Sequence, residues 1–204
     1  MKKISLLSII CLLAACTAGN KLLISEVNKK GNTDSIPDAV IRSLQQKNDI
    51  VLAFATENYA WGRSFNYSII CKNQDGWTGC KYQKKNMPDN NSANLSPVTV
   101  NTAACDSLLS YRTANKIWEI KGETGEGGNR CPNGNENCNI NDAANNRLWL
   151  ITKERFIAPS YYAASFFEEC CPGNKDRNLF LMTGLKLTGI VNNAVEDDDI
   201  KMEY

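Results

Sequence analysis

The chain has 204 residues, a length typical of one domain that can bury a sizeable core. Its 23 lysines and arginines nearly balance 22 aspartates and glutamates, so the charge gives no reason to expect a nucleic-acid partner. Histidine is absent, which excludes Ser-His-Asp and Cys-His nucleophile pairs, histidine general bases and mixed Cys/His zinc sites. A pair of carboxylates, a Ser-Lys pair or an all-cysteine metal site stays open.

The first fifteen residues have the features of an export signal. Lys2 and Lys3 supply positive charge, and residues 4–13 form an almost unbroken apolar run that small residues follow. A membrane-spanning helix needs roughly 20 apolar residues, so this run is too short to remain as a span. We therefore expect residues 1–15 to be a signal peptide.

The residues Leu13-Ala14-Ala15-Cys16 resemble the lipobox of bacterial lipoproteins. In that family the signal is cut before the cysteine, which becomes acylated; the resemblance covers residues 1–16 only. It implies that Cys16 is lipidated and that the lipid bilayer is a partner, since each buried methylene contributes about 0.8 kcal/mol. In that family an aspartate directly after the cysteine favours retention in the inner membrane. Thr17 stands at that position here, so the resemblance implies the outer membrane in a two-membrane cell, with the domain in the periplasm or outside. Ordinary secretion with an incidental Cys16 thiol is the alternative.

The composition after Cys16 predicts a tether followed by one domain. Residues 16–34 are mostly polar and are expected to be the tether, and residues 35–204 the domain. Ser35 to Asp38 carry helix-start signals, and Asn48 ends the helix that they predict. The apolar run over residues 49–56 predicts a central strand that is buried on both faces.

A hairpin is expected next. Residues 66–72 and 77–84 have the composition of strands, and Asp75-Gly76 is a two-residue turn signal. That turn pairs Cys71 with Cys80 at a non-hydrogen-bonded position, where side chains approach most closely. We therefore predict a Cys71–Cys80 cross-strand disulfide.

The other cysteines are also expected to form disulfides, because oxidising conditions outside the cytoplasm favour them. Cys131 and Cys138 enclose a polar loop and are predicted to staple it. Cys105 is predicted to bond either Cys170 or Cys171, and the spacing does not choose between them. The remaining thiol is buried in one interpretation and forms an intermolecular crosslink in the other.

The remaining segments complete an α+β fold class: one disulfide-braced domain with an antiparallel sheet and two or three packed helices. They are, in order, a loop at 85–97, a helix at 103–112 capped by Asn101 or Thr102, strands at 116–121 and 147–153, a helix from Pro159-Ser160 to Cys171, a segment at 178–191 left open between helix and strand, and an acidic tail from Glu196.

The longest irregular stretch, residues 122–146, is the expected binding surface. Loops of this length inside a compact domain are usually functional or mobile. Asn133 and Asn135, together with Trp61 and Trp77 if the fold brings them near, are the candidate binding residues.

No metal or cofactor is expected. A calcium loop starting at Asn133 would need glycine and glutamate where Cys138 and Ala144 stand. The spacing of the cysteines at 131, 138, 170 and 171 does not match the usual zinc sites. No spacing selects a catalytic pair from the carboxylates Glu57, Glu119, Glu123, Glu154, Glu168 and Glu169.

These observations predict a membrane-anchored envelope lipoprotein that binds an envelope protein or a glycan without catalysis. The alternatives are an envelope hydrolase that uses paired carboxylates and an immunity or inhibitor lipoprotein that acts against a secreted toxin.

Overall fold

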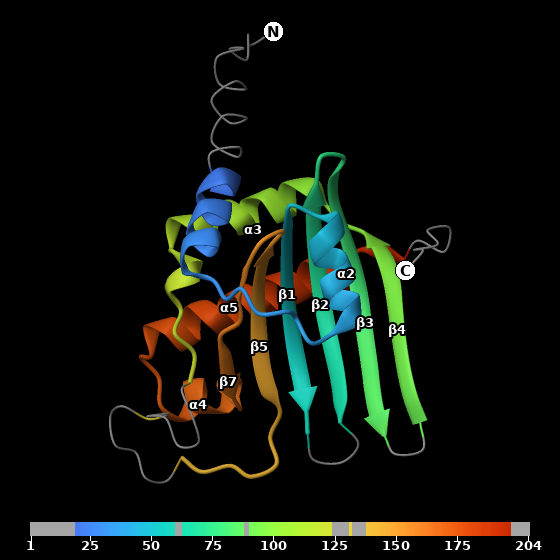
Figure 1. The fold of residues 1–204 in the computed structure, drawn as a ribbon. Helices are drawn as coiled ribbons and strands as arrows, with labels where there is room; N and C mark the ends of the chain where they lie inside the picture. Colours follow the sequence, from blue (N-terminus) through green and yellow to red (C-terminus); the bar gives the residue numbers. More distant parts are fainter. Residues whose placement is uncertain (1–18, 60–62, 88–89, 124–130, 132–137, 197–204) are drawn as a thin grey trace, which may run out of the picture.

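A single antiparallel sheet organises the computed structural model, which describes residues 19–59, 63–87, 90–123, 131 and 138–196 (Figure 1). The eight strands run in the order β6-β5-β1-β2-β3-β4-β8, and β7 also pairs with β5. Their bounds are β1 Ile50–Asn58, β2 Ser64–Asn73, β3 Gly76–Met87, β4 Asn90–Thr99, β5 Asn145–Thr152, β6 Phe156–Ile157, β7 Ser160–Tyr162 and β8 Val195–Glu196. The α+β class with an antiparallel sheet is confirmed.

Strand β1 lies at the centre of the sheet and is buried on both faces. It pairs with β2 on one side and with β5 on the other. Alternate residues point to opposite faces, so Ile50 and Leu52 join one apolar cluster while Val51 and Ala53 join the other. The central strand expected from the apolar run is therefore confirmed.

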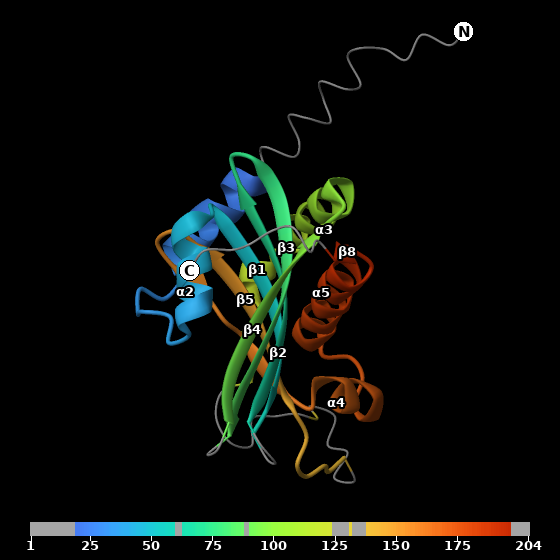
Figure 2. The same ribbon diagram turned by 90° about the vertical axis from the view of Figure 1, so that its right-hand side faces the viewer.

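Helices cover the two faces of the sheet unequally (Figure 2). Helix α2 (Ala39–Lys47) packs on one face, and α3 (Thr102–Ala114) and α5 (Lys175–Asn192) lie on the other. The short α4 (Ala164–Cys170) precedes α5, and a 3₁₀ turn, η1 (Ile117–Glu119), follows α3. No helix among the described residues is long and apolar enough to cross a membrane.

An asparagine or aspartate side chain caps the N-terminus of each of the helices α2, α3 and α5. Asp38 caps α2, Asn101 caps α3 by accepting from the backbone N–H of Ala104, and Asn174 caps α5 by accepting from that of Arg177. Such caps satisfy backbone donors that a helix start leaves without partners. The helices predicted to end at Asn48 and to run over 103–112 are confirmed, and the segment left open at 178–191 is helical.

Residues 19–30 are helical, whereas the sequence predicted an irregular tether there. Leu23 and Val27, one turn apart, are fully buried in the same cluster as the core residues of α3 and α5. The polar composition of this segment masked an apolar pair at helical spacing. The domain therefore includes at least these residues.

Three later segments also differ from the prediction. The expected loop at 85–97 forms the end of β3 and most of β4. Among the described residues β8 pairs with β4 only at Val98 and Thr99, so the rest of β4 is an edge there, where polar residues are common. The strand expected at 116–121 is the turn η1, which buries both Ile117 and Trp118. The start of the helix predicted from Pro159 forms β7 instead.

The hairpin of β2 and β3 has a different register from the predicted one. Asn73 pairs with Gly76, so the two-residue turn is Gln74-Asp75. Cys71 therefore faces Thr78, and Cys80 is its diagonal neighbour on the same face. Cβ atoms of diagonal neighbours are far more widely spaced than a disulfide allows. Both thiols are free and buried, and the predicted Cys71–Cys80 bond is wrong.

Candidate functional site

A pocket of about 310 Å³ opens on the sheet face that carries α2. Four adjacent strands supply its walls through residues spaced two apart, which point to the same face because side chains alternate along a strand. These pairs are Glu57 and Tyr59 at the end of β1, Phe65 and Tyr67 on β2, Lys84 and Asn86 on β3, and Arg147 and Trp149 on β5. The volume is at the lower end of the range for small-ligand sites.

Glu57 is the buried centre of the pocket's polar wall, with 3% of its surface exposed. Arg147 donates from Nε to Oε1 at 2.9 Å and from Nη2 to Oε2 at 3.3 Å. The Tyr59 hydroxyl donates to Oε2 at 2.7 Å, and Asn145 Nδ2 donates to it at 3.1 Å. Burial and the hydrogen bond to Glu57 raise the pKa of Tyr59, so its hydroxyl stays protonated as a donor.

The second carboxylate of the pocket, Asp38, is equally engaged. Its Oδ1 accepts from the backbone N–H groups of Val40 and Ile41 at 3.0 and 3.2 Å. Its Oδ2 accepts from the Tyr82 hydroxyl at 3.1 Å and from Lys84 Nζ at 2.9 Å. Asp38 thus caps α2 and ties that helix to β3.

The chemistry that this arrangement can perform follows from these contacts. Each carboxylate accepts from several donors and is paired with a cation, Arg147 for Glu57 and Lys84 for Asp38. A general acid needs a carboxyl group that is free to give its proton to a ligand, and both carboxylates are already bonded to other groups. Asp38 and Glu57 therefore hold Lys84 and Arg147 in fixed positions at the pocket.

Aromatic rings form the rest of the wall. Tyr67 stacks on Tyr82 with ring centroids 5.1 Å apart, and Tyr59 meets Phe65 edge to face at 5.6 Å. Trp149 packs on Phe156 at 5.4 Å, and its buried indole N–H has no acceptor among the described residues. Rings fixed by such contacts offer flat apolar faces to a ligand.

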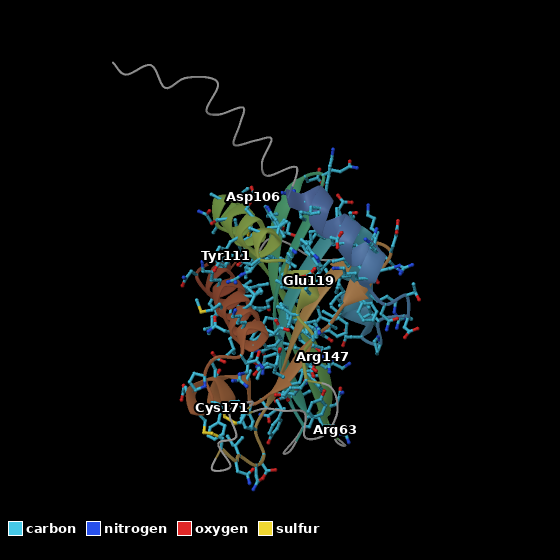
Figure 3. The ribbon with its side chains drawn as sticks, turned by 90° about the vertical axis from the view of Figure 1, so that its left-hand side faces the viewer. Arg63, Asp106, Tyr111, Glu119, Arg147 and Cys171 are labelled. Atoms are coloured by element: carbon cyan, nitrogen blue, oxygen red, sulfur yellow. A yellow bond between two sulfur atoms is a disulfide. The ribbon has the colours of Figure 1, made fainter. Side chains whose placement is uncertain are left out.

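The predicted binding residues do not gather at one place. Trp61, Asn133 and Asn135 lie outside the described residues, as does Cys16. Trp77 Nε1 donates to Asp106 Oδ1 on α3 at 2.8 Å, and Asp106 lies at the end of the molecule away from Cys171 (Figure 3). Trp77 is buried in the core, so its ring is not exposed to a ligand.

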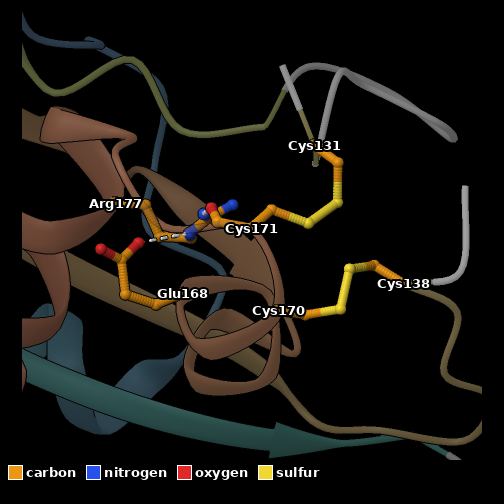
Figure 4. The surroundings of a disulfide bond; sticks show 6 residues. All are labelled: Cys131, Cys138, Glu168, Cys170, Cys171 and Arg177. Atoms are coloured by element: carbon orange, nitrogen blue, oxygen red, sulfur yellow. Dashed lines mark hydrogen bonds and ion pairs between the residues drawn. A yellow bond between two sulfur atoms is a disulfide. The ribbon is translucent and has the colours of Figure 1, made fainter. Parts of the chain in front are cut away.

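Two disulfides close the opposite end of the molecule (Figure 4). Cys131 bonds Cys171 and Cys138 bonds Cys170, with Cα–Cα distances of 5.3 and 5.9 Å. The predicted Cys131–Cys138 staple is wrong, because the adjacent cysteines at the end of α4 each hold a different end of the loop. Of the predicted pairs with Cys105 neither forms: Cys105 is a free, buried thiol on α3.

The same end of the chain is joined to α5 by a buried ion pair. Arg177 Nε donates to Glu168 Oε2 at 2.9 Å, and Arg177 Nη2 donates to the backbone oxygen of Cys171 at 2.5 Å (Figure 4). The sulfurs of Cys131, Cys138 and Cys171 lie within 4.8 Å of one another. While both disulfides are intact, these sulfurs offer no thiolate to a metal ion.

The residues that sequence reasoning missed are Asp38, Lys84, Arg147 and Trp149, while Glu57 was only one of several carboxylates. For Lys84, Arg147 and Trp149 the signal is a charged residue two positions from an aromatic one on neighbouring strands, and it can be read only when the strand pairing is known. Asp38 lies outside the strands, as the cap of α2. No protein-family model matches this chain, and no curated protein matches its sequence. The function is therefore argued from the geometry.

Proposed function

We propose that this chain is a cell-envelope lipoprotein, anchored through Cys16, whose domain binds an envelope glycan in the Glu57–Arg147 pocket without changing it chemically. The lipobox-like residues 13–16 support the anchor. The two disulfides are compatible with a domain outside the cytoplasm, where oxidising conditions preserve such bonds.

The observation that carries the binding role is the combination of aromatic walls with carboxylates whose acceptor positions are already used. Tyr59, Phe65 and Tyr67 present ring surface that can stack on a sugar ring. Lys84 and Arg147 are held in place by Asp38 and Glu57, so their remaining N–H groups are pre-positioned for hydroxyl or carbonyl oxygens. A volume of about 310 Å³ suits one sugar unit rather than a long segment of chain.

The alternative of a hydrolase with paired carboxylates is less well supported by the same pocket. Its two carboxylates are paired with Lys84 and Arg147, and neither is left as a separate acid. The two functions differ in what happens to the glycan: a binding protein releases it intact, whereas a hydrolase cleaves it.

The test is a titration of the full chain with soluble oligosaccharide fragments of the cell envelope, followed by calorimetry and tryptophan fluorescence. Tyr59→Ala removes a ring from the wall and should weaken binding about tenfold, a loss typical of one aromatic contact. Tyr59→Phe keeps the ring and should bind almost as the native chain does. Tyr111→Ala is the matched control, because Tyr111 is equally exposed (51% against 52%) and lies on α3, across the sheet (Figure 2).

Three results would reject parts of the proposal. An equal loss of binding in the Tyr59 and Tyr111 variants would reject this pocket, and an absence of saturable binding would reject glycan as the ligand class. Cleaved fragments in the recovered glycan would favour the hydrolase. Mass spectrometry of the native chain tests the anchor separately, since an uncut, unacylated chain would reject it.

A further inference from the structure

A second cavity, of about 530 Å³, is lined by residues of α3 and α5. These helices lie on the other side of the sheet from α2 (Figure 2). The last turn of α3 forms one wall, and the first turns of α5 with the preceding α4–α5 connection form the other. We call it the Arg112 cavity, because Arg112 lines it and has buried side-chain nitrogens without a hydrogen-bond partner.

Arg112 is a buried cation without a hydrogen-bond partner. Only 1% of its surface is exposed, and its Nε, Nη1 and Nη2 find no acceptor among the described residues. A guanidinium remains protonated in proteins, and a buried charge without a counter-charge is among the most unfavourable arrangements in a fold. Buried polar groups in native proteins nearly always have a partner, so an acceptor is missing here.

The carboxylates that line the cavity are engaged with other groups. Glu168 accepts from Arg177 Nε at 2.9 Å and from Asn178 Nδ2 at 3.3 Å. Asp176 accepts from the backbone N–H of Lys121 at 3.4 Å. Neither makes a hydrogen bond or an ion pair with Arg112, so neither supplies the missing acceptor.

The end of α3 does not supply an acceptor either. Arg112 stands in the last turn of that helix, where a positive charge is favoured. The Tyr111 carbonyl there accepts instead from the backbone and the side-chain nitrogens of Asn115, at 3.2 and 2.7 Å. The Arg112 guanidinium lies over the Tyr111 ring, with Cζ 4.5 Å from the ring centroid.

The charges around the cavity indicate what the missing group is. Glu168 is paired with Arg177, and Lys175 and Asp176 carry opposite charges, so among the described residues that line the cavity Arg112 is left without a counter-charge. Lys186 adds a further positive charge beside the cavity, with Nζ 5.1 Å from the Tyr111 ring centroid. One negative charge on a ligand would balance Arg112, whereas a doubly charged phosphate would also be repelled by the two carboxylates. A carboxylate fits the guanidinium fork through two parallel hydrogen bonds.

Two large hydrophobic residues that line the cavity are unusually exposed. Tyr111 is 51% exposed and Met182 is 43% exposed, although both are large hydrophobic residues, and Leu179 lies beside them. Exposed apolar surface around a buried polar group is the pattern of a ligand site. The ligand therefore carries an apolar body as well as its charge.

We propose that the Arg112 cavity binds a small monocarboxylate, whose carboxylate bonds the Arg112 guanidinium and whose apolar body packs on Tyr111 and Met182. The guanidinium turns toward the cavity mouth through rotation of its side chain when the carboxylate enters. This site is separate from the glycan pocket and does not depend on it.

Benzoate is the probe, with benzamide as its neutral analogue of the same shape. The melting temperature of the full chain should rise by several degrees at a benzoate concentration about 100 times its Kd, and benzamide should produce no shift. Phosphate should bind more weakly than benzoate. The Arg112 Nε–H resonance should move during the benzoate titration.

Two variants and one control locate the effect. Arg112→Met should abolish the response to benzoate, and Arg112→Lys, which keeps the charge but loses the fork, should bind about tenfold more weakly. Arg63→Met removes the same charge from an exposed position that does not line the cavity, and it should respond as the native chain does (Figure 3).

The proposal is overturned if the native chain shows neither a melting shift nor a moving Arg112 resonance with benzoate. An undiminished response in Arg112→Met, or an equal loss in Arg63→Met, also overturns it. Tighter binding of phosphate than of benzoate would overturn the assignment to a monocarboxylate. If Arg112→Met fails to fold, the lysine variant and the native resonance decide the question.

Discussion

Glu57 on β1 and Arg147 on β5 are diagonal neighbours on adjacent strands. Arg147 pairs with Ala55 in the strand register, and its guanidinium donates two hydrogen bonds to the Glu57 carboxylate. The side chain of Glu57 is 4% exposed and that of Arg147 is 28% exposed. A pair so far out of water contributes mainly by preventing an uncompensated buried charge.

Removal of one partner should therefore destabilise the fold more than removal of both. We expect Arg147→Met to lower the free energy of unfolding by about 3 kcal/mol, because it leaves Glu57 buried without a cation. The double variant Glu57→Gln with Arg147→Met should recover much of this loss. Urea unfolding of the four chains of this double-mutant cycle measures the coupling, and strictly additive losses would contradict it.

The disulfide pattern gives a second prediction. A peptide map without reduction should contain Cys131 joined to Cys171 and Cys138 joined to Cys170, and a Cys131–Cys138 peptide would contradict the structure. The paired variant Cys131→Ser with Cys171→Ser should lose about 4 kcal/mol on the chain-entropy model for a separation of 40 residues. Cys105→Ala, which removes a free thiol, should leave the map unchanged.

Stability should fall in alkaline solution. Burial raises the pKa of Cys80 from 9.0 to about 12, that of Cys105 from 9.0 to about 11, and that of Tyr161 from 10.0 to about 12. The folded chain holds these protons more tightly than the unfolded chain does, so the stabilisation is complete below pH 9 and is lost as the pH rises toward 12.

The measurement for this third prediction is the urea unfolding free energy from pH 8 upward, with tyrosinate absorbance recorded in parallel. Near neutral pH, thiol reagents should label none of Cys71, Cys80 and Cys105 in the folded chain, since all three thiols are buried and protonated. In denaturant all three should react. A free energy of unfolding that stays constant between pH 9 and 12 would contradict this prediction.

Two glycines of α5 provide a matched pair. A Cβ added to Gly184 would lie within 2.5 Å of Phe54 ring carbons Cδ2 and Cζ, whereas one added to Gly189 would meet nothing within 4 Å. Gly184→Ala should therefore cost about 1–3 kcal/mol through forced repacking of α5 on the sheet. Gly189→Ala should stabilise the helix by up to about 1 kcal/mol.

Thermal unfolding of both variants tests the fourth prediction, with the native chain as reference. The sign of the effect should differ between the two positions. Equal effects would mean that helix propensity alone determines them and that α5 does not approach β1 as closely as the structure has it.

Local signals predicted much of the fold. The apolar run of β1 and the cap asparagine of α3 depend on residues close together in the chain, and both were readable. The β4 strand was missed because it is rich in asparagine and serine and gains its strand structure from pairing with β3.

The candidate site was much less predictable, for a physical reason. Glu57 and Arg147 are 90 residues apart and meet only through the pairing of β1 with β5. Disulfide connectivity has the same character, because spacing cannot show that Cys170 and Cys171, at the end of a predicted helix, lie beside Cys138 and Cys131. Contacts of this kind follow from register and topology, which composition does not specify.

The helix over residues 19–30 limits how far the domain could stand from a bilayer if the proposed lipid anchor is present. Cys16 precedes its first described residue by three positions, so extended chain of about 10 Å at most separates them. An acylated Cys16 would leave almost no slack, and the domain would rest directly on the lipid headgroups with the N-terminal helix nearest to them. The disulfide-braced end would then point away from the bilayer (Figure 1).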